Sequence, residues 1–427
     1  MEKLAKHNNI LRGIYESLGD SNHKEITTGL IDLDSIDSIL RTLLSIDEMR
    51  EAGSFFTGKK LAELSIINVG LSNDDQSSVV LDPTCGAGNL LIASTSLFNI
   101  YPTLSQTLER WGKRLYGFDL YESFIDAAKL RIIFEAINRG AIKDCSLEEA
   151  MDYLSNIYVR DVMSLDHSAL KDISHIVMNP PFSIWESPKT GIWKQGRVNA
   201  AGIVLEHVLL HAPKGAKISA ILPDVLRSGS RYNHWRKFIS QSVNAYVKTL
   251  GRFNPKTDVD VFLLYGEVYE NNKEIKWNER VISDKDTVVS DHFDVRVGPL
   301  VAYRDPLEGI NAPYIHSKNS PPWSTIDKFT EYRKFNGKLI ETPFVVIRRT
   351  SSPSDKERVI ATLVACPFSK VAVENHLIIL RPKNGLLEDC HWLLTKLRSE
   401  SVNAYINDVI RCRHLTVGVV KEIPTSL

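Results

Sequence analysis

The stretch that decides the fold is Val79–Asn89, VVLDPTCGAGN, in which an apolar run leads into a glycine-rich turn and then a helix-like segment. Gly86 and Gly88 would let the backbone approach a ligand, and the helix start offers free N–H groups. A simple tight turn or a dehydrogenase would show the same two glycines. The dinucleotide fingerprint GxGxxG fails because position 91 is Leu. Asp82 at the end of the strand would repel phosphate but suits the ammonium of an amino acid.

Around this stretch, short apolar runs alternate with helical segments, which is typical of a parallel sheet with crossover helices. We expect helices at 89–99, 122–138, 200–212 and 231–242. The expected strands are SVVLDP, RLYGFDL, NIYVRDV, SHIVMNP, AKISAILP, AYVKTLG and VFLLYGEV. Seven strands in a doubly wound order predict a complete α/β nucleotide-type domain.

The composition is that of an ordinary globular protein of 427 residues, with 43% hydrophobic and 24% charged residues. No apolar run is long enough to cross a bilayer, and the first residues lack the apolar stretch of a signal peptide. Five scattered cysteines without a CxxC pair predict a cytoplasmic protein without zinc. Lys and Arg balance Asp and Glu at 52 each, so global charge gives no pointer to nucleic acid.

The pattern changes along the chain, and we expect three segments. Residues 1–50 predict a helical segment, with apolar residues at helical spacing between 36 and 44. Residues 51–276 hold the sheet, and a polar stretch near 271–277 marks the boundary. Residues 277–427 predict a smaller α+β domain, with β-type runs such as PFVVIRRT and HLIILRP. From Lys338 to Leu427 there are 13 Lys and Arg against nine Asp and Glu.

Three further motifs carry chemistry. Asp119 ends the second strand, where a carboxylate can accept hydrogen bonds from both ribose hydroxyls of a nucleoside, or simply cap a helix. Asn179, followed by Pro-Pro-Phe, is held rigidly, so its oxygen and the Pro180 carbonyl could bind the two N–H groups of an exocyclic amine. Phe182 could then stack on the base. A structural double-proline turn is the alternative. Thr57 in GSFFT would also serve as a helix N-cap.

Taken in order, these motifs resemble the gamma class of adenine-N6 DNA methyltransferases, found in type I modification subunits and solitary type II enzymes. The resemblance covers roughly residues 30–270 and rests on GSFFTG, LDPTCGAGN, YGFDL, VRDV, VMNPPF, AILPDVL and DVFLL. It implies a Rossmann-like domain, S-adenosyl-L-methionine as cofactor and double-stranded DNA as substrate. NPPF, rather than the SPPW of cytosine-N4 enzymes, implies adenine, which must be extruded from the helix to react.

The resemblance also implies the site residues, and no metal is expected among them. The cofactor-binding set is Phe56, Thr57, Asp82, Thr84, Cys85, Gly86, Gly88, Asn89, Asp119, Leu120 and Asp161. The catalytic set is Asn179, Pro180, Pro181 and Phe182. Phe182 and Phe253 are the candidates to pack against the extruded base, although a core position is an equal alternative for Phe253.

Residues from 297 onward are similar to half of a target-recognition domain, in which Arg348 and Arg349 could read guanine or grip phosphate, or lie in a solvated loop. A restriction or defence system is implied, with a cognate restriction endonuclease or specificity subunit as a possible partner and a monomer or homodimer as the assembly. Two other functions stay open. One is methylation of RNA or of a protein glutamine, and the other is an inactive DNA-binding subunit of a restriction complex.

Overall fold

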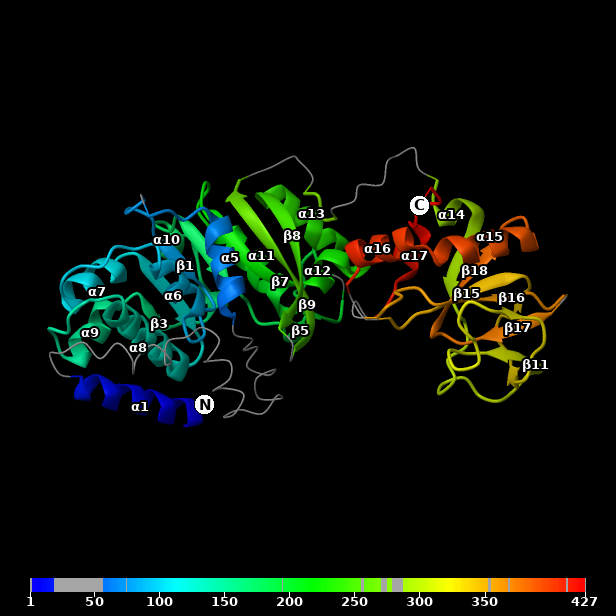
Figure 1. Cartoon of the computed structure of the whole chain (residues 1–427), viewed down its shortest axis with the longest axis horizontal. Helices are drawn as coiled ribbons and strands as arrows, with labels where there is room; N and C mark the ends of the chain where they lie inside the picture. Colours follow the sequence, from blue (N-terminus) through cyan, green and yellow to red (C-terminus); the bar gives the residue numbers. More distant parts are fainter. Residues whose placement is uncertain are drawn as a thin grey trace. The chain divides into compact units, whose positions relative to one another are not determined.

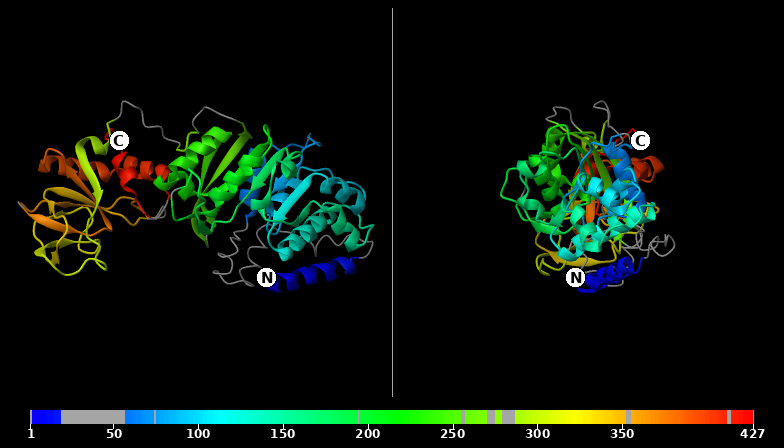
Figure 2. Two further views of the ribbon diagram at one scale, coloured as in Figure 1. Left: turned by 180° about the vertical axis from the view of Figure 1, so that it is seen from behind. Right: turned by 90° about the vertical axis from the view of Figure 1, so that its left-hand side faces the viewer.

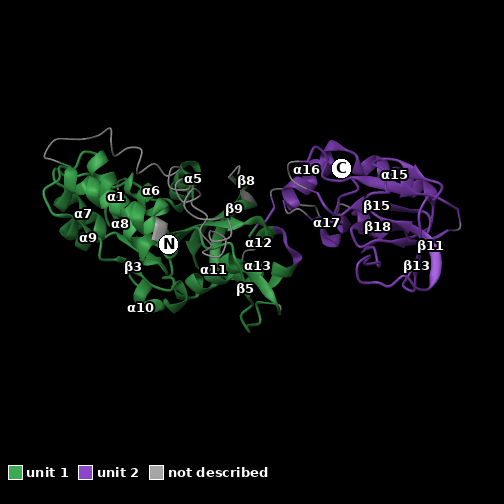
Figure 3. Ribbon diagram, turned by 90° about the horizontal axis from the view of Figure 1, so that it is seen from below, with its two compact units in different colours: residues 1–227, 231–275 green, residues 228–230, 276–427 purple. Residues whose placement is uncertain are grey.

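The computed structural model describes residues 2–18, 57–73, 75–193, 195–254, 257–269, 275–278, 287–351, 355–367, 369–411 and 414–426 (Figure 1). The chain forms two compact units (Figure 3). Unit 1 comprises residues 1–227 and 231–275, and unit 2 comprises residues 228–230 and 276–427. None of the helices described is long and apolar enough to span a membrane. The apolar positions expected on a helix between 36 and 44 lie outside the described residues.

Unit 1 is built on a seven-stranded sheet in the order β3-β2-β1-β4-β7-β9-β8 (Figures 1 and 2). The Rossmann-like α/β fold expected from the sequence is confirmed. The central strands are fully buried because helices cover both faces, and their residues are apolar except for Asp82 at the end of one strand and His175 at the start of another. The strands are β1 (Val80–Asp82), β2 (Leu115–Asp119), β3 (Ile157–Val159), β4 (His175–Met178), β7 (Lys217–Pro223), β8 (Val243–Asn254) and β9 (Thr257–Val268).

One strand departs from the expected parallel arrangement. β9 runs antiparallel to both of its neighbours, β7 and β8. The reason is the connection, since β8 ends at Asn254 and β9 begins at Thr257. A link this short can join only antiparallel strands, because a parallel pair needs a crossover of a dozen or more residues. The sheet is therefore mostly parallel, with one reversed strand near its edge.

The helices divide between the two faces of this sheet. The crossovers from β1 to β2 and from β2 to β3 move one way across the sheet, whereas the crossover from β4 to β7 moves the other way. Because crossovers are right-handed, helices of the first kind cover one face and those of the second kind the other. These helices are α6 (Asn89–Thr95) and α8 (Glu122–Asn138) on one face, and α11 (Ala200–His211) with its neighbour α13 (Asn233–Ser242) on the other. The helix expected at 89–99 ends earlier, at Thr95.

Further elements of unit 1 complete this frame. The N-terminal α1 (Glu2–Ser17) packs on α8, where Arg12 forms an ion pair with Asp126 at 2.9 Å and Asn8 donates to the Ser123 carbonyl. A short hairpin follows β4. The remaining elements are α5 (Lys59–Val69), α7 (Leu104–Gly112), α9 (Leu147–Tyr153), η1 (Val162–Ser164), α10 (His167–Leu170), β5 (Ile184–Glu186), β6 (Arg197–Asn199), α12 (Asp224–Ser228) and η2 (Ser230–Tyr232). Residues 228–230, which include the end of α12 and the start of η2, belong to unit 2.

Unit 2 is an α+β fold of two sheets and four helices in the residues described (Figure 3). A five-stranded sheet has the order β10-β18-β15-β16-β12, and a four-stranded sheet the order β13-β11-β17-β14. The first sheet buries one apolar face against the helices and the other against the second sheet. The elements are α14 (Val289–His292), β10 (Phe293–Val297), β11 (Ile310–Ile315), β12 (Thr325–Ile326), β13 (Tyr332–Phe335), β14 (Ile340–Glu341), β15 (Phe344–Arg348), β16 (Ala361–Val364), β17 (Lys370–Val373), β18 (Leu377–Pro382), α15 (Leu387–Leu397), α16 (Glu400–Val409) and α17 (Val417–Lys421).

Candidate active site

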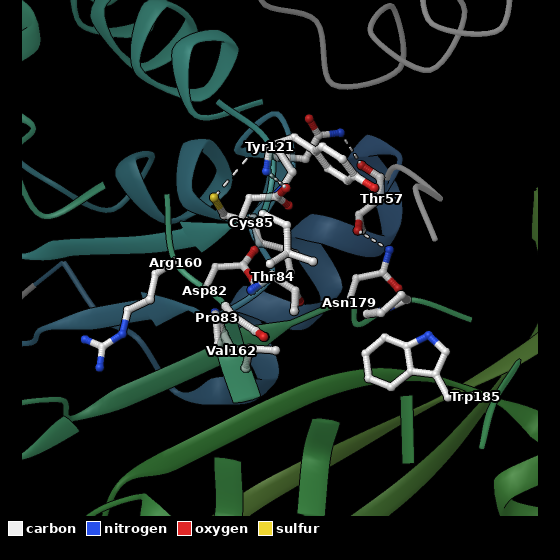
Figure 4. A pocket seen from close by; sticks show the side chains of 17 residues that line it. Thr57, Asp82, Pro83, Thr84, Cys85, Tyr121, Arg160, Val162, Asn179 and Trp185 are labelled. Carbon is white, nitrogen blue, oxygen red and sulfur yellow. Dashed lines mark hydrogen bonds between the residues drawn. The ribbon is translucent and has the colours of Figure 1, made fainter. Parts of the chain in front are cut away.

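A pocket in unit 1 lies where the parallel strands end (Figure 4). β1 ends at Asp82, β2 at Asp119, and β4 directly before Asn179, so all three polar side chains meet at one edge of the sheet. β1 and β4 are neighbours whose crossovers run in opposite directions, which is the position where open α/β sheets bind ligands. The lining residues are Thr57, Asp82, Pro83, Thr84, Cys85, Gly86, Asn89, Leu90, Asp119, Leu120, Tyr121, Arg160, Asp161, Val162, Asn179, Pro181 and Trp185.

The glycine turn between β1 and α6 forms one wall of this pocket. Gly86 has a φ of +51°, a conformation that favours glycine, and its N–H donates to the Asp119 carboxylate at 3.1 Å. Cys85 is buried, its N–H donates to the Phe118 carbonyl at 2.8 Å, and burial raises the pKa of its thiol well above the usual value. A thiol in this state is a poor nucleophile. The Thr84 hydroxyl is buried and has no hydrogen-bond partner among the described residues, which suits a ligand that bonds to it.

Gly88, which was predicted to bind the cofactor together with Gly86, does not line the pocket. Its φ is +82°, and a Cβ added there would lie 3.0 Å from the Cβ and 3.1 Å from the Cα of Ala128 on α8. The structure thus explains this glycine by the close packing of two helices.

We expect Gly88→Ala to lower the free energy of unfolding of unit 1 by about 3 kcal/mol, from backbone strain and overpacking together. Gly70→Ala is the matched control, because Gly70 has a φ of +74° but faces only the flexible end of Lys217. It should cost about 1 kcal/mol. Urea unfolding followed by near-UV circular dichroism measures both. Equal losses in the two variants would contradict the packing explanation.

The two strand-end carboxylates differ in their protonation. Asp82 is 2% exposed, and burial raises its pKa to about 8; the Thr84 N–H, which donates to Asp82 at 3.1 Å, opposes the rise, and the neighbouring Asp119 adds to it. Burial also raises the pKa of Asp119, to about 6, although the N–H groups of Tyr121 and Gly86 donate to its carboxylate. Two acids with raised pKa values in one pocket are typical of a functional site, and a cationic ligand would favour their charged forms.

Asn179 is joined to Thr57 and to α6 by a chain of hydrogen bonds (Figure 4). Its Nδ2 donates to the Thr57 hydroxyl at 3.1 Å, and the Thr57 carbonyl accepts from Asn89 Nδ2 at 2.7 Å. Asn89 Oδ1 accepts in turn from Arg131, which is fully buried on α8. Asn89 faces the pocket, but both ends of its amide are used in this chain of bonds. Thr57 is expected as a helix N-cap in one interpretation, yet the cap of α5 is Gly58.

The two phenylalanines expected at the target base lie together and are buried. Phe182 is 8% and Phe253 6% exposed, and their rings meet edge to face with centroids 5.7 Å apart. Neither lines the pocket, whereas Trp185, in the hairpin after β4, does (Figure 4). Trp185 was not predicted from the sequence. Its position three residues after Phe182 could have indicated a second aromatic residue near the target base. Tyr121 and Arg160, each next to a predicted residue, were also not predicted.

The remaining predicted residues of unit 1 fall in three places. Leu120 and Asp161 line the pocket, and Asp161 also caps the short helix η1 by accepting from the Met163 N–H at 2.9 Å. Pro181 lines it too, and Pro180 is buried beside Asn179 without lining it. Phe56 lies outside the described residues. No group of three or more His, Cys, Asp or Glu side chains that could hold a metal occurs in the described part of the chain.

A family model described as N-6 DNA Methylase matches residues 35–252, which is more than half of the chain. The chain belongs to this N-6 DNA methylase family. The matched region contains the glycine turn, both strand-end acids and Asn179. No curated protein sequence matches the chain.

Solved structures are similar to this chain at low sequence identity. The type IIL restriction-modification enzyme MmeI in complex with DNA is 11% identical, with 92% of this chain and 71% of that chain covered and a TM-score of 0.55. The DrdV–DNA complex is 13% identical, with 95% and 58% covered and a TM-score of 0.50. The type IIG restriction endonuclease BpuSI is 15% identical, with 91% and 60% covered and a TM-score of 0.47. This chain therefore spans about 60% of the length of BpuSI and of DrdV.

The two arginines expected to contact DNA lie in unit 2, at the end of β15. Arg348 Nη2 donates to the Ser320 carbonyl at 2.8 Å, and Arg349 Nη1 donates to the Asn375 carbonyl at 3.5 Å. Both side chains are half-buried. Their role in DNA recognition stays a prediction.

Proposed function

We propose that the chain transfers a methyl group from S-adenosyl-L-methionine to the N6 amino group of an adenine in double-stranded DNA. The observation that carries this proposal is the meeting of Asp82, Asp119 and Asn179 in one pocket, beside the glycine turn. The first two suit a cofactor that is an amino acid at one end and a nucleoside at the other. The third suits an exocyclic amine.

The residues of the pocket fit this cofactor. Asp82 and the Thr84 hydroxyl, which has no hydrogen-bond partner among the described residues, lie side by side and suit the charged amino-acid end. Asp119 retains accepting capacity for ribose hydroxyls, because each of its oxygens receives one backbone N–H in the residues described. Leu120 and Val162 provide an apolar wall for a base. When bound, S-adenosylmethionine supplies an electrophilic methyl group on a positively charged sulfur.

The chain's own residues would prepare the target amine. The lone pair of adenine N6 is delocalised into the ring, so two acceptors that bind its N–H groups favour the geometry in which the lone pair is available. Asn179 Oδ1 and the Pro180 carbonyl are the proposed acceptors. Reaching them requires extrusion of the adenine from the duplex. Phe182, Phe253 and Trp185 are the aromatic residues that would pack on it.

Thr57 has two candidate roles, one as a cofactor contact and one as a positioning residue that orients the Asn179 amide. We expect Thr57→Val to lower kcat about tenfold, the value of one neutral hydrogen bond of about 1.4 kcal/mol, with Kd for the cofactor nearly unchanged. Thr57→Ser keeps the hydroxyl and should restore kcat. Single-turnover kinetics and calorimetry separate the two quantities. A weakened Kd with normal kcat would assign Thr57 to the cofactor instead.

We further propose that residues 277–427 form a target-recognition domain and that the chain is the modification part of a restriction or defence system. Residues 277–427 would select the DNA sequence at which residues 51–276 methylate. A restriction endonuclease or a specificity subunit would be a partner of the chain. Supporting this is the separate compact unit that these residues form. The family membership of residues 35–252 supports the DNA substrate.

Long-read sequencing of DNA from cells expressing the chain alone tests the proposal. N6-methyladenine at one sequence motif is expected, and it should be missing from cells expressing Asn179→Ala. Methylated RNA or methylated protein glutamine with unmodified DNA would reject the DNA substrate. If a co-expressed partner proves necessary, purified chain should still bind the cofactor.

A further inference from the structure

Unit 2 contains a wide groove between the edge strands of its two sheets. β10 is the edge of the five-stranded sheet and β14 is the edge of the four-stranded sheet. Residues of both strands, and of their inner neighbours β18 and β17, line the groove. Its space, measured to the open mouth, is about 1560 Å³, against about 860 Å³ for the pocket of unit 1.

The side chains that line this groove are strongly cationic. Six of them are basic and two, Asp294 and Glu341, are acidic. Glu341 forms ion pairs with two of the bases, Lys370 at 3.7 Å and Arg381 at 3.2 Å. The other four bases form no ion pair within the described residues. The six bases, here called the basic groove, are Arg296, Lys338, Lys370, Arg381, Lys383 and Lys421.

We propose that the basic groove binds the sugar-phosphate backbone of double-stranded DNA, an inference that rests on the proposed function. Cations from separate strands and from α17 are brought to one surface, which concentrates positive charge on a chain whose net charge is zero. Such a surface attracts a polyanion by counterion release. A single-stranded nucleic acid would need exposed aromatic rings for its bases, whereas Phe293, the one aromatic residue among the described residues that line the groove, is 1% exposed. The geometry therefore points to a duplex.

The groove is separate from the two arginines at the end of β15. Arg348 pairs with Leu377 at the start of β18, whereas Arg381 lies near the end of the same strand. Phosphate contacts position a protein on DNA but carry no sequence information. The basic groove should therefore set the affinity for DNA and leave the choice of sequence to other side chains.

The test neutralises two exposed lysines of the groove in the full chain, Lys383→Gln with Lys421→Gln. The probe is a fluorescein-labelled 30-base-pair duplex, and anisotropy gives Kd between 50 and 300 mM NaCl. Each lost phosphate contact should reduce the slope of log K against log salt by about 0.9, so the double variant should lose about 2 in slope and bind about 30-fold more weakly at 0.15 M salt. Methylation at saturating DNA should keep the same sites.

Matched controls decide between this inference and others. Lys318→Gln with Lys356→Gln removes two exposed lysines of unit 2 that do not line the groove, and it should leave Kd and slope unchanged. Lys383→Arg with Lys421→Arg should bind as the original chain does. Unchanged DNA binding with increased self-association of the groove variant would show that these lysines keep copies of the chain apart, and it would overturn the proposal. Lost binding to polyglutamate with normal DNA binding would overturn it in favour of an acidic protein partner.

If the original chain methylates DNA and the groove variant binds it equally well, only this inference fails. If the original chain neither binds nor methylates DNA, the proposed function fails with it.

Discussion

Asn179→Ala is expected to lower kcat for DNA methylation at least about 10²- to 10³-fold while leaving the Kd for S-adenosylmethionine within about twofold. The loss corresponds to removal of one preorganised hydrogen-bonding group at the reacting centre. The Asn179 amide is held by the Thr57 hydroxyl at 3.1 Å and stands directly after a buried strand, so its orientation exists before substrate arrives. Rapid-quench methyl transfer to duplex DNA measures kcat, and calorimetry measures Kd.

Two variants separate catalysis from binding at this position. Asn179→Asp keeps the shape and one acceptor oxygen but loses the donor to Thr57, so it should retain more activity than the alanine variant. Phe182→Ala should be milder than either, because stacking on a base is worth about 1 to 3 kcal/mol. If Asn179→Ala transfers methyl groups at the original rate, the residue has no catalytic role. If the alanine variant instead loses cofactor affinity, Asn179 belongs to the cofactor site.

The sheet of unit 1 was predictable because each strand is a short apolar run and these runs alternate with segments of helical pattern. All seven expected strands are present, and α8 begins and ends at the expected residues. The reversed direction of β9 was not expected, although only two residues separate it from β8. The first of the two expected runs ended too early, at Gly251, and the second began too late, at Val261. The true strands are 12 residues long each, which hid the hairpin.

The candidate site was predictable where a residue ends a parallel strand, since such residues meet at one edge of the sheet whatever the connections. Asp82, Asp119 and Asn179 came together for this reason. Residues whose position depends on packing were harder to place. Gly88 shares a turn with Gly86 but faces Ala128. Trp185 lines the pocket because it lies in a hairpin, and the sequence around it shows no alternating pattern that would predict one. The burial of both strand-end acids also has no sequence signal, because it depends on helices that cover the sheet.

That burial predicts a strong pH dependence of cofactor binding. In the free chain the pKa of Asp82 is about 8, so its carboxyl is mostly protonated at pH 7. The ammonium group of the cofactor would favour the carboxylate and lower this pKa in the complex. Binding then releases a proton at every pH between the two pKa values. The affinity should fall about tenfold for each pH unit below 8, or about 100-fold between pH 7.5 and pH 5.5.

Two other groups titrate nearby, and the measurement can be arranged around them. The amino group of the cofactor has a pKa of roughly 8, so below pH 7.5 its charge is nearly constant. Asp119 has a pKa of about 6 and should steepen the fall below that pH. Asp82 is therefore the main titrating group between pH 7.5 and 6.5, and calorimetry in buffers of different ionisation enthalpy should count a net release that rises from about half a proton at pH 7.5 to about one at pH 6.5. Asp82→Asn is the control: its side chain has nearly the same shape, cannot ionise, and should bind weakly with no proton release in this window. Equal proton release by the original chain and Asp82→Asn would show that another group releases the proton. An affinity that does not change between pH 7.5 and 6.5 would show that the ammonium group of the cofactor does not bind next to Asp82.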